Sequence, residues 1–350
     1  MQLMRGCLPA SKPLPAASSR MSPLVLRGGQ AWRVAPRLSV NRGLTPAARR
    51  TVKAQAAPPS DAFILDFDGV LLDSEREVTA SAFTASKQRW PHIFGSLSAD
   101  DELRISEGMR AVRPVLIKGY ESMIMARILA EDGPKAVDSI LADWSKLQAE
   151  RLAQWNEKAE DLTSQYESLR NEEMKKPEWQ ALQQPYMGVK DALGSCPYPY
   201  YIATSKAAHR VSPLMAAYFG VDIPPDSPRM FASLLPPDEA KANALEQISQ
   251  RPLIKESGAT VHFIDDRLET LKNAAARPSL SNIKLYLANW GYNTKSEREE
   301  AANMKNVRVI GLPQFSELLR FGLVMNVDDG CEPTEEEKGY GNPSRVSDEE

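Results

Sequence analysis

Residues 62–74 read AFILDFDGVLLDS. The stretch begins with four apolar residues, and a short apolar run of this kind predicts a buried β-strand. Two aspartates, Asp66 and Asp68, follow where that strand should end, and Gly69 lets the backbone turn closely after them. In open α/β sheets the binding crevice lies off the carboxyl ends of the strands. The stretch therefore predicts a strand of the sheet and a polar site at its end.

Strand and helix patterns alternate from residue 187 to about residue 325. Repeated units of this kind predict a parallel sheet covered by helices on both faces, which the strand at 62–66 should join. The predicted fold class is therefore α/β. The expected strands are 200–204, 229–232, 260–265, 283–288 and 307–310. The expected helices are 187–193, 207–219, 238–250, 268–276 and 315–321, with Asp238 as the N-cap of the third.

The block at 75–186 is different, because no strand pattern interrupts it. Pro114 is well placed to open one helix, and the apolar spacing from Val137 to Trp155 predicts a second. The charged segment 157–176 predicts a third. An all-helical segment is thus inserted after the first strand. The predicted domains are a core of residues 61–74 and 187–325 and a helical insertion of residues 75–186.

The two ends of the chain differ from this body. Residues 1–60 contain ten Arg or Lys and no acidic residue, which is typical of an organelle transit peptide; a basic tail that stays attached is the alternative. The Ser and Pro content favours the chloroplast stroma over the mitochondrion. Residues 326–350 are acidic and poor in apolar residues, which predicts a disordered tail.

Charge and hydropathy exclude some partners. The chain has a net charge of −3, and because its basic residues are concentrated in the first 60, the remainder is strongly acidic. An acidic body argues against nucleic acid or an anionic membrane as the main partner. No apolar run approaches the length of a membrane span.

The Asp66–Asp68 pair offers what phosphoryl transfer from an ester requires, a nucleophile and a proton donor. Asp66 would attack the phosphorus and bind Mg²⁺. Asp68 would protonate the leaving alcohol and then deprotonate the attacking water. A pair of loop aspartates that caps the next helix is the alternative. A calcium loop of the EF-hand type is excluded, because neither its series of ligands nor its terminal Glu follows.

Three further elements fall at strand ends or on a helix facing that edge. Thr204 could donate to a phosphate oxygen, and Lys241 could hold both the Asp66 carboxylate and the phosphate. Asp265 and Asp266 repel each other unless a cation binds, and oxygen ligands suit Mg²⁺. Taken singly, these residues are explained as a helix cap, a surface lysine and an N-cap pair. Their occurrence together and in this order along the chain favours a phosphate and metal site instead.

The order Asp-x-Asp-Gly-Val, Thr, Lys, Asp-Asp resembles the four signature motifs of haloacid dehalogenase-like hydrolases, over residues 62–325. The segments 265–270 and 290–292 are similar to those of phosphoglycolate phosphatase-like members. The resemblance implies a Rossmann-like core with a helical cap, Mg²⁺, and an aspartyl-phosphate on Asp66. The site residues it implies are Thr204 and Lys241 for phosphate, and Asp66, the Asp68 carbonyl and Asp265 or Asp266 for the metal.

Some positions depart from this pattern or compete with it. The adjacent Asp pair leaves open which carboxylate binds the metal directly. Lys206 and Lys255 are rivals of Lys241, although Lys206 could instead be a second phosphate contact. In the cap, Arg110 and Arg113 could recognise a second anionic group of the substrate; a solvated basic helix face is the alternative.

These observations predict a magnesium-dependent phosphatase that acts on a small phosphorylated metabolite. One alternative is a phosphomutase, which returns the phosphoryl group to the substrate from the same intermediate. Another is a catalytically silent interaction protein that keeps the fold. The sequence indicates neither the phosphate ester nor the oligomeric state.

Overall fold

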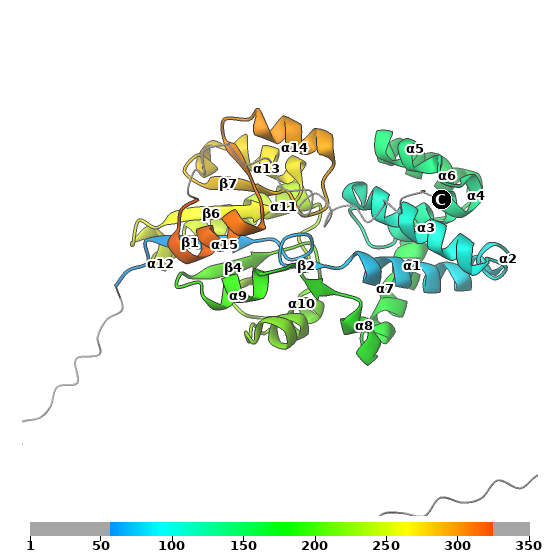
Figure 1. The fold of residues 1–350 in the computed structure, drawn as a ribbon, viewed down its shortest axis with the longest axis horizontal. Helices are drawn as coiled ribbons and strands as arrows, with labels where there is room; N and C mark the ends of the chain where they lie inside the picture. Colours follow the sequence, from blue (N-terminus) through cyan, green and yellow to red (C-terminus); the bar gives the residue numbers. More distant parts are fainter. Residues whose placement is uncertain (1–56, 325–350) are drawn as a thin grey trace, which may run out of the picture. The chain divides into compact units, whose positions relative to one another are not determined.

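The computed structural model describes residues 57–324. Its main strands are β1 (Asp61–Leu65), β4 (Tyr200–Ala203), β5 (Met230–Phe231), β6 (Thr260–Asp265), β7 (Lys284–Ala288) and β8 (Val307–Ile310). They form one six-stranded sheet in the order β5-β4-β1-β6-β7-β8, and every neighbouring pair is parallel (Figure 1). The predicted α/β, Rossmann-like fold is confirmed, and β1 lies between β4 and β6 in the middle of the sheet.

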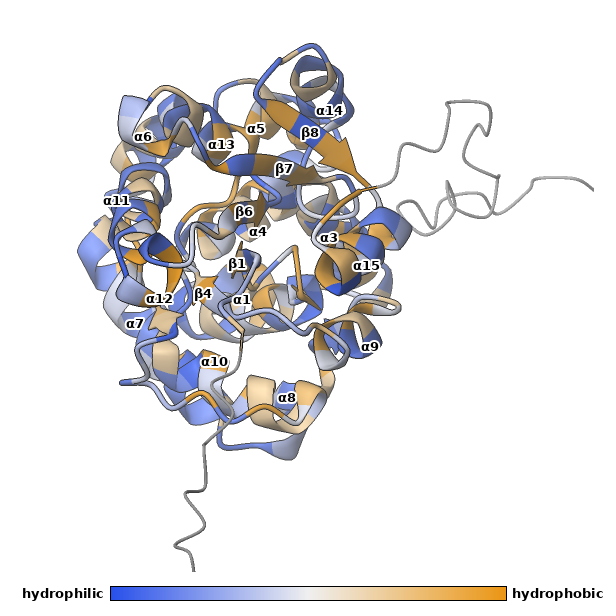
Figure 2. Cartoon of the chain, turned by 90° about the vertical axis from the view of Figure 1, so that its left-hand side faces the viewer, coloured by the Kyte–Doolittle hydropathy of each residue, from blue (hydrophilic) through white to orange (hydrophobic). Residues whose placement is uncertain are grey.

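Successive residues of β1 serve the two faces of the sheet in turn. Phe63 and Leu65 belong to one hydrophobic cluster, whereas Ala62 and Ile64 belong to another. In Figure 2 most strand segments are hydrophobic, while the surrounding helices carry hydrophilic stretches. Helices α9 (Val189–Gly194), α10 (Ala208–Leu214) and α15 (Leu312–Phe321) cover the first face, and α11 (Pro237–Ser249), α12 (Pro252–Lys255), α13 (Leu268–Ala275) and α14 (Lys295–Ala302) the second.

Most of the predicted elements of this part are present, with two differences. Asp238 is not an N-cap: α11 begins at Pro237, whose missing N–H suits the first helical position, and the Asp238 carboxylate accepts a hydrogen bond from Thr270 instead. Helix α14 was not expected, because its sequence KSEREEAA has no apolar period. By contrast, the helix expected to reach Phe219 does so through a π-helical turn, and Gly220 ends it at φ 67°.

The predicted insertion between β1 and β4 is mainly helical and has a hydrophobic core of its own. From here on, the term helical insertion means its helical part, residues 75–181. Its helices are α1 (Glu75–Arg89), α2 (Pro91–Phe94), α3 (Ala99–Val112), α4 (Glu121–Asp132), α5 (Ala136–Ala142), α6 (Trp144–Trp155), α7 (Ala159–Glu173) and α8 (Pro177–Ala181). Its hydrophobic cluster draws on buried residues of α1 to α7. The domain boundaries stated above stay a prediction.

Two expectations for the helical insertion are wrong. Pro114 opens no α-helix: it lies in a 3₁₀ turn (Arg113–Val115), and the helix expected there begins at Glu121. The single helix expected from Val137 to Trp155 is broken into α5 and α6 at Asp143, whose side chain accepts a hydrogen bond from the Lys146 N–H and so caps α6.

A short antiparallel ribbon joins the two ends of the helical insertion. Strand β2 (Leu72–Asp73) pairs with β3 (Gln184–Pro185); neither strand was expected, and β3 lies in the block predicted to be all-helical. The Tyr186 N–H also donates to the Leu71 carbonyl at 3.3 Å. The chain therefore leaves the sheet and returns to it at neighbouring points.

The predicted transit peptide, apart from its last residues, and the predicted acidic tail lie outside the described residues, as do the localisation signals expected there. Among the described helices, none is long and apolar enough for a membrane span.

A buried ion pair holds α1 against α7. Glu77 is fully buried; its carboxylate accepts a hydrogen bond from Arg170 Nε at 2.7 Å, pairs with Arg170 Nη2, and accepts another from Trp179 Nε1 at 3.0 Å. Burial raises the pKa of Glu77, but Arg170 outweighs burial and lowers that pKa to about 2. The charged form is therefore the stable one in the folded protein.

We predict that Glu77→Gln lowers the free energy of unfolding by about 3 kcal/mol at pH 7, because it leaves the Arg170 charge buried without its partner. The folded-state pKa of Glu77 lies below the unfolded value of 4.5, so the ion pair stabilises the fold above pH 4.5 and loses its effect as the pH falls towards 2. Urea unfolding at several pH values checks both expectations. A deficit in the variant that does not shrink below pH 4.5 contradicts them.

Candidate active site

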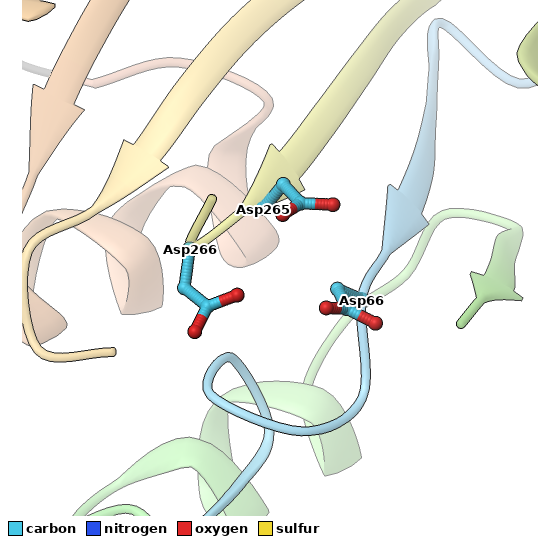
Figure 3. A group of neighbouring side chains, drawn as sticks. All are labelled: Asp66, Asp265 and Asp266. Atoms are coloured by element: carbon cyan, nitrogen blue, oxygen red, sulfur yellow. The ribbon is translucent and has the colours of Figure 1, made fainter. Parts of the chain in front are cut away.

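Two neighbouring parallel strands bring three carboxylates together. Asp66 follows β1 directly, Asp265 ends β6, and Asp266 comes next. Leu65 of β1 is in register with Ile264 of β6, so both strands end at the same level. Figure 3 shows the three side chains facing one region beyond the strand ends, and one oxygen of each lies within 4.8 Å of the others. The structure therefore brings together three of the residues that the sequence singled out, and their predicted roles stay a prediction.

Burial and mutual repulsion disfavour the charged forms of Asp66 and Asp266. Burial, opposed by Lys241 and assisted by the charge of Asp265, raises the pKa of Asp66 to about 6. Burial, followed by the charges of Asp66 and Asp265, raises the pKa of Asp266 well above its ordinary value. All three residues have at most 5% of their surface exposed. The repulsion among them is an energy that a bound cation would relieve.

Lys241, which the sequence singled out as a partner of Asp66, lies against this cluster. Its ammonium lies 2.9 Å from Asp66 Oδ2 and 2.7 Å from Asp265 Oδ2, and the lysine is 1% exposed. Burial lowers its pKa, but the two aspartates outweigh burial and raise it above the ordinary value. The rival Lys255 is exposed and bonds Gln250, away from this cluster.

Asp68 lies in the same pocket but outside the cluster of three carboxylates. Its carboxylate forms an ion pair with Lys206 at 2.9 Å, and the Lys206 ammonium also donates to Gln183 at 2.8 Å. Lys206 is buried, and burial lowers its pKa. Lys206 therefore positions Asp68 rather than replacing Lys241. Its partner Gln183, which adjoins β3, was not identified from the sequence.

Gly69 is required where it stands. Its φ of 87° is in the left-handed region, and a Cβ added there would overlap the Asp266 carboxylate. Gly291 packs against the same aspartate from the other side, where a Cβ would overlap Asp266 and the Gly69 carbonyl. The two glycines thus allow the loop after β1 and the loop after β7 to close tightly around Asp266.

Thr204 follows β4, at the same sheet edge as Asp66. It is buried, and its hydroxyl accepts a hydrogen bond from the Lys206 N–H at 3.2 Å. Thr204 does not line the pocket described below, whereas the next residue, Ser205, does. The geometry therefore presents Ser205 to a ligand, a residue that sequence reasoning passed over.

A pocket of about 50 Å³ lies over these groups. The helical insertion supplies part of its wall through Arg113, Pro114, Leu116 and Ile117. From the sheet side it is lined by Asp66, Asp68, Ser205, Pro237, Lys241, Asp266, Arg267 and Tyr292. The pocket is small, and its polar wall contains both acidic and basic side chains.

Of the two candidate arginines, only Arg113 reaches the pocket. Its guanidinium lies 4.0 Å from the ring centroid of Tyr292. Burial lowers the pKa of Arg113, but Tyr292, Asp68 and Asp266 outweigh burial and raise it. Arg110 is instead exposed and pairs with Glu75 at 3.4 Å, so its predicted role in the site is not supported by its position.

The donor set fits a hard divalent cation. Asp66, Asp265 and Asp266 offer only carboxylate oxygens, and oxygen is the ligand that Mg²⁺ and Ca²⁺ prefer. Lys241 neutralises one of the three negative charges, which leaves an excess that a divalent ion would balance. Among residues 57–324, this is the group of acidic side chains whose spacing suits a metal ion.

No protein-family model matches the chain, and no curated protein matches it. Three solved structures with a similar fold are a haloacid dehalogenase-like family hydrolase from Streptococcus pneumoniae, a predicted phosphatase from Clostridium acetobutylicum and a predicted phosphoglycolate phosphatase from Haemophilus somnus. Their identities are 16, 15 and 15%, and their TM-scores 0.44, 0.43 and 0.44. The alignments cover 75, 74 and 77% of this chain and 98, 97 and 100% of those chains.

One of these solved structures, the Streptococcus pneumoniae hydrolase, bears the family name that the sequence motifs resemble. At identities and TM-scores this low, the likeness says nothing about the chemistry of this chain, which has to be inferred from its own side chains.

We predict that Gly69→Ala weakens Mg²⁺ binding about 10- to 100-fold, because the added Cβ displaces the Asp266 carboxylate. Titration calorimetry measures the affinity. Gly220→Ala is the matched control: its φ of 67° is also left-handed, but no atom lies within 4 Å of the added Cβ, so it should lower stability by about 1 to 2 kcal/mol and leave Mg²⁺ binding intact. Equal Mg²⁺ affinity in Gly69→Ala and wild type contradicts the prediction.

Proposed function

We propose that this protein is a magnesium-dependent phosphatase that hydrolyses a small phosphomonoester through an aspartyl-phosphate on Asp66. The observation that carries this proposal is the position of the Asp66 carboxylate. It lies in the wall of a pocket, 2.9 Å from the Lys241 ammonium, beside two further carboxylates suited to a cation and with Asp68 in the same wall.

In the first step, one Asp66 oxygen attacks the phosphorus, an O–P bond forms, and the bond to the leaving alcohol oxygen breaks. Asp68 gives its proton to that oxygen, so the alcohol leaves neutral. In the second step, Asp68 takes a proton from a water molecule, which attacks the phosphorus and releases phosphate from Asp66. Asp68 is 17% exposed, so solvent can supply the proton it needs before the first step.

Lys241, and a metal ion bound at the carboxylate cluster, would stabilise the charge that builds up on the phosphate. Lys241 is held against Asp66 by its two ion pairs and is placed to contact both Asp66 and a phosphate oxygen. We assign Mg²⁺ to Asp66, Asp265 or Asp266, and the Asp68 carbonyl, where it would supply positive charge to the phosphate oxygens. Thr204 is proposed to order the loop through its bond with the Lys206 N–H.

Arg113 suggests the substrate class. It is the basic residue that the helical insertion contributes to the pocket, and its Nε has no hydrogen-bond partner among the described residues. A guanidinium is well suited to bind a carboxylate or a second phosphate. The small volume of the pocket favours a short metabolite. We therefore propose a small phosphomonoester that carries a second anionic group.

We predict that Asp66→Asn abolishes phosphate release from a panel of phosphoglycolate, sugar phosphates and nucleotides with Mg²⁺, because the amide is not a nucleophile. Asp68→Asn should lower kcat about 10²- to 10⁴-fold through loss of the general acid. Asp191→Asn, at an exposed carboxylate on α9, serves as the control and should match wild type. Activity in Asp66→Asn equal to wild type, or no activity in wild type, excludes the proposal. A requirement for a sugar bisphosphate indicates a phosphomutase.

We predict that Arg113→Met raises KM for phosphoglycolate about 10- to 100-fold more than KM for p-nitrophenyl phosphate, which has no second anion. The loss of one charge-assisted hydrogen bond accounts for this difference. Arg110→Met removes a neighbouring arginine that lies outside the pocket and should leave both KM values as in wild type. Equal effects of Arg113→Met on the two substrates contradict the proposed role.

A further inference from the structure

We propose that Tyr292 is a positioning residue that holds Arg113 and the Asp266 carboxylate at a fixed separation, and so couples the helical insertion to the carboxylate cluster. The roles of the two residues that it positions rest on the proposed function. Tyr292 follows β7 at the sheet edge. It contacts the cluster with its backbone, the entrance to the helical insertion with its hydroxyl, and Arg113 with its ring.

The first contact fixes Asp266. The Tyr292 N–H donates to Asp266 Oδ2 at 2.7 Å. The tight packing of Gly69 and Gly291 around the same aspartate leaves little room for the carboxylate to turn away from this bond. This hydrogen bond fixes the Tyr292 backbone, and with it the Cβ end of the side chain, against the carboxylate cluster.

The second contact fixes the phenol end of the side chain. The Tyr292 hydroxyl donates to Asp73 Oδ1 at 2.8 Å and accepts from the Ser74 N–H at 2.7 Å. The same Asp73 oxygen accepts from the Glu75 N–H, the first residue of α1, at 3.1 Å. The hydroxyl therefore binds the place where the chain enters the helical insertion.

With both ends held, the ring forms a rigid platform for Arg113. The guanidinium lies 4.0 Å from the ring centroid, a cation–π distance. No carboxylate of the described residues forms an ion pair with Arg113. The ring is thus what places the guanidinium over the pocket, and its fixed orientation sets the distance between the phosphate at Asp66 and a second anion at Arg113.

Double-mutant analysis tests this coupling. Tyr292→Leu should raise KM for phosphoglycolate about 5- to 30-fold more than KM for p-nitrophenyl phosphate, the range that a cation–π contact supplies. Arg113→Met should raise it by the larger factor of about 10 to 100 given above, and the double variant should show no more than this larger single effect. Tyr292→Phe keeps the ring but loses its hydroxyl anchor, so it should show a smaller loss than Tyr292→Leu. Multiplying effects in the double variant, or a loss in Tyr292→Phe as large as in Tyr292→Leu, overturn the proposal.

Hydrogen exchange without substrate separates this inference from the phosphatase proposal. In Tyr292→Leu and in Arg113→Met, the backbone amides of residues 115–118 should exchange about 5- to 30-fold faster, with no further gain in the double variant. In Tyr292→Phe, which keeps the fold most closely, the Ser74 amide should exchange faster because it loses its acceptor. Wild-type exchange at both places in all variants overturns the coupling, whatever the outcome for Asp66.

Discussion

The mutual repulsion of three buried carboxylates is the constraint on which the rest of this structure depends. Asp66, Asp265 and Asp266 are almost fully buried, and Lys241 neutralises only part of their charge. Flexible segments would let such groups move apart. Here the ends of two hydrogen-bonded strands hold two of them, and Gly69 closes a turn over the third. The central position of β1 and the tight loop after it both serve to keep this cluster together.

The sheet could be predicted from the sequence because its short apolar runs alternate with helical segments, and repeated units of this kind predict a parallel sheet. The helical insertion was harder for a physical reason. A 3.6-residue apolar period continues across a break, so the pattern from Val137 to Trp155 concealed the cap at Asp143. Pro114 is compatible with the first turn of an α-helix and equally with the 3₁₀ turn in which it lies.

In the candidate site too, residues marked by a local sequence pattern could be predicted, whereas contacts between residues distant in the sequence could not. Residues at strand ends, such as Asp66 and Asp265, were predictable because parallel strands present their carboxyl ends at one edge. The bond of Lys206 with Gln183 and that of Tyr292 with Asp73 join residues far apart in the sequence, and no local pattern encodes them. Arg110 and Arg113 differ only because the 3₁₀ turn redirects the chain at the end of α3, which spacing alone does not indicate.

The β2–β3 ribbon gives the helical insertion an evolutionary freedom that the sheet lacks. Both ends of the insertion meet in that ribbon. The sheet is therefore joined to the insertion through two paired strands that lie side by side, like the two strands of a short hairpin. Lengthening such an excursion costs little, since each doubling of a loop adds only about 0.6 kcal/mol of closure entropy. The helices of the insertion can therefore be exchanged as a module, while the strand ends that carry the acidic cluster stay in place.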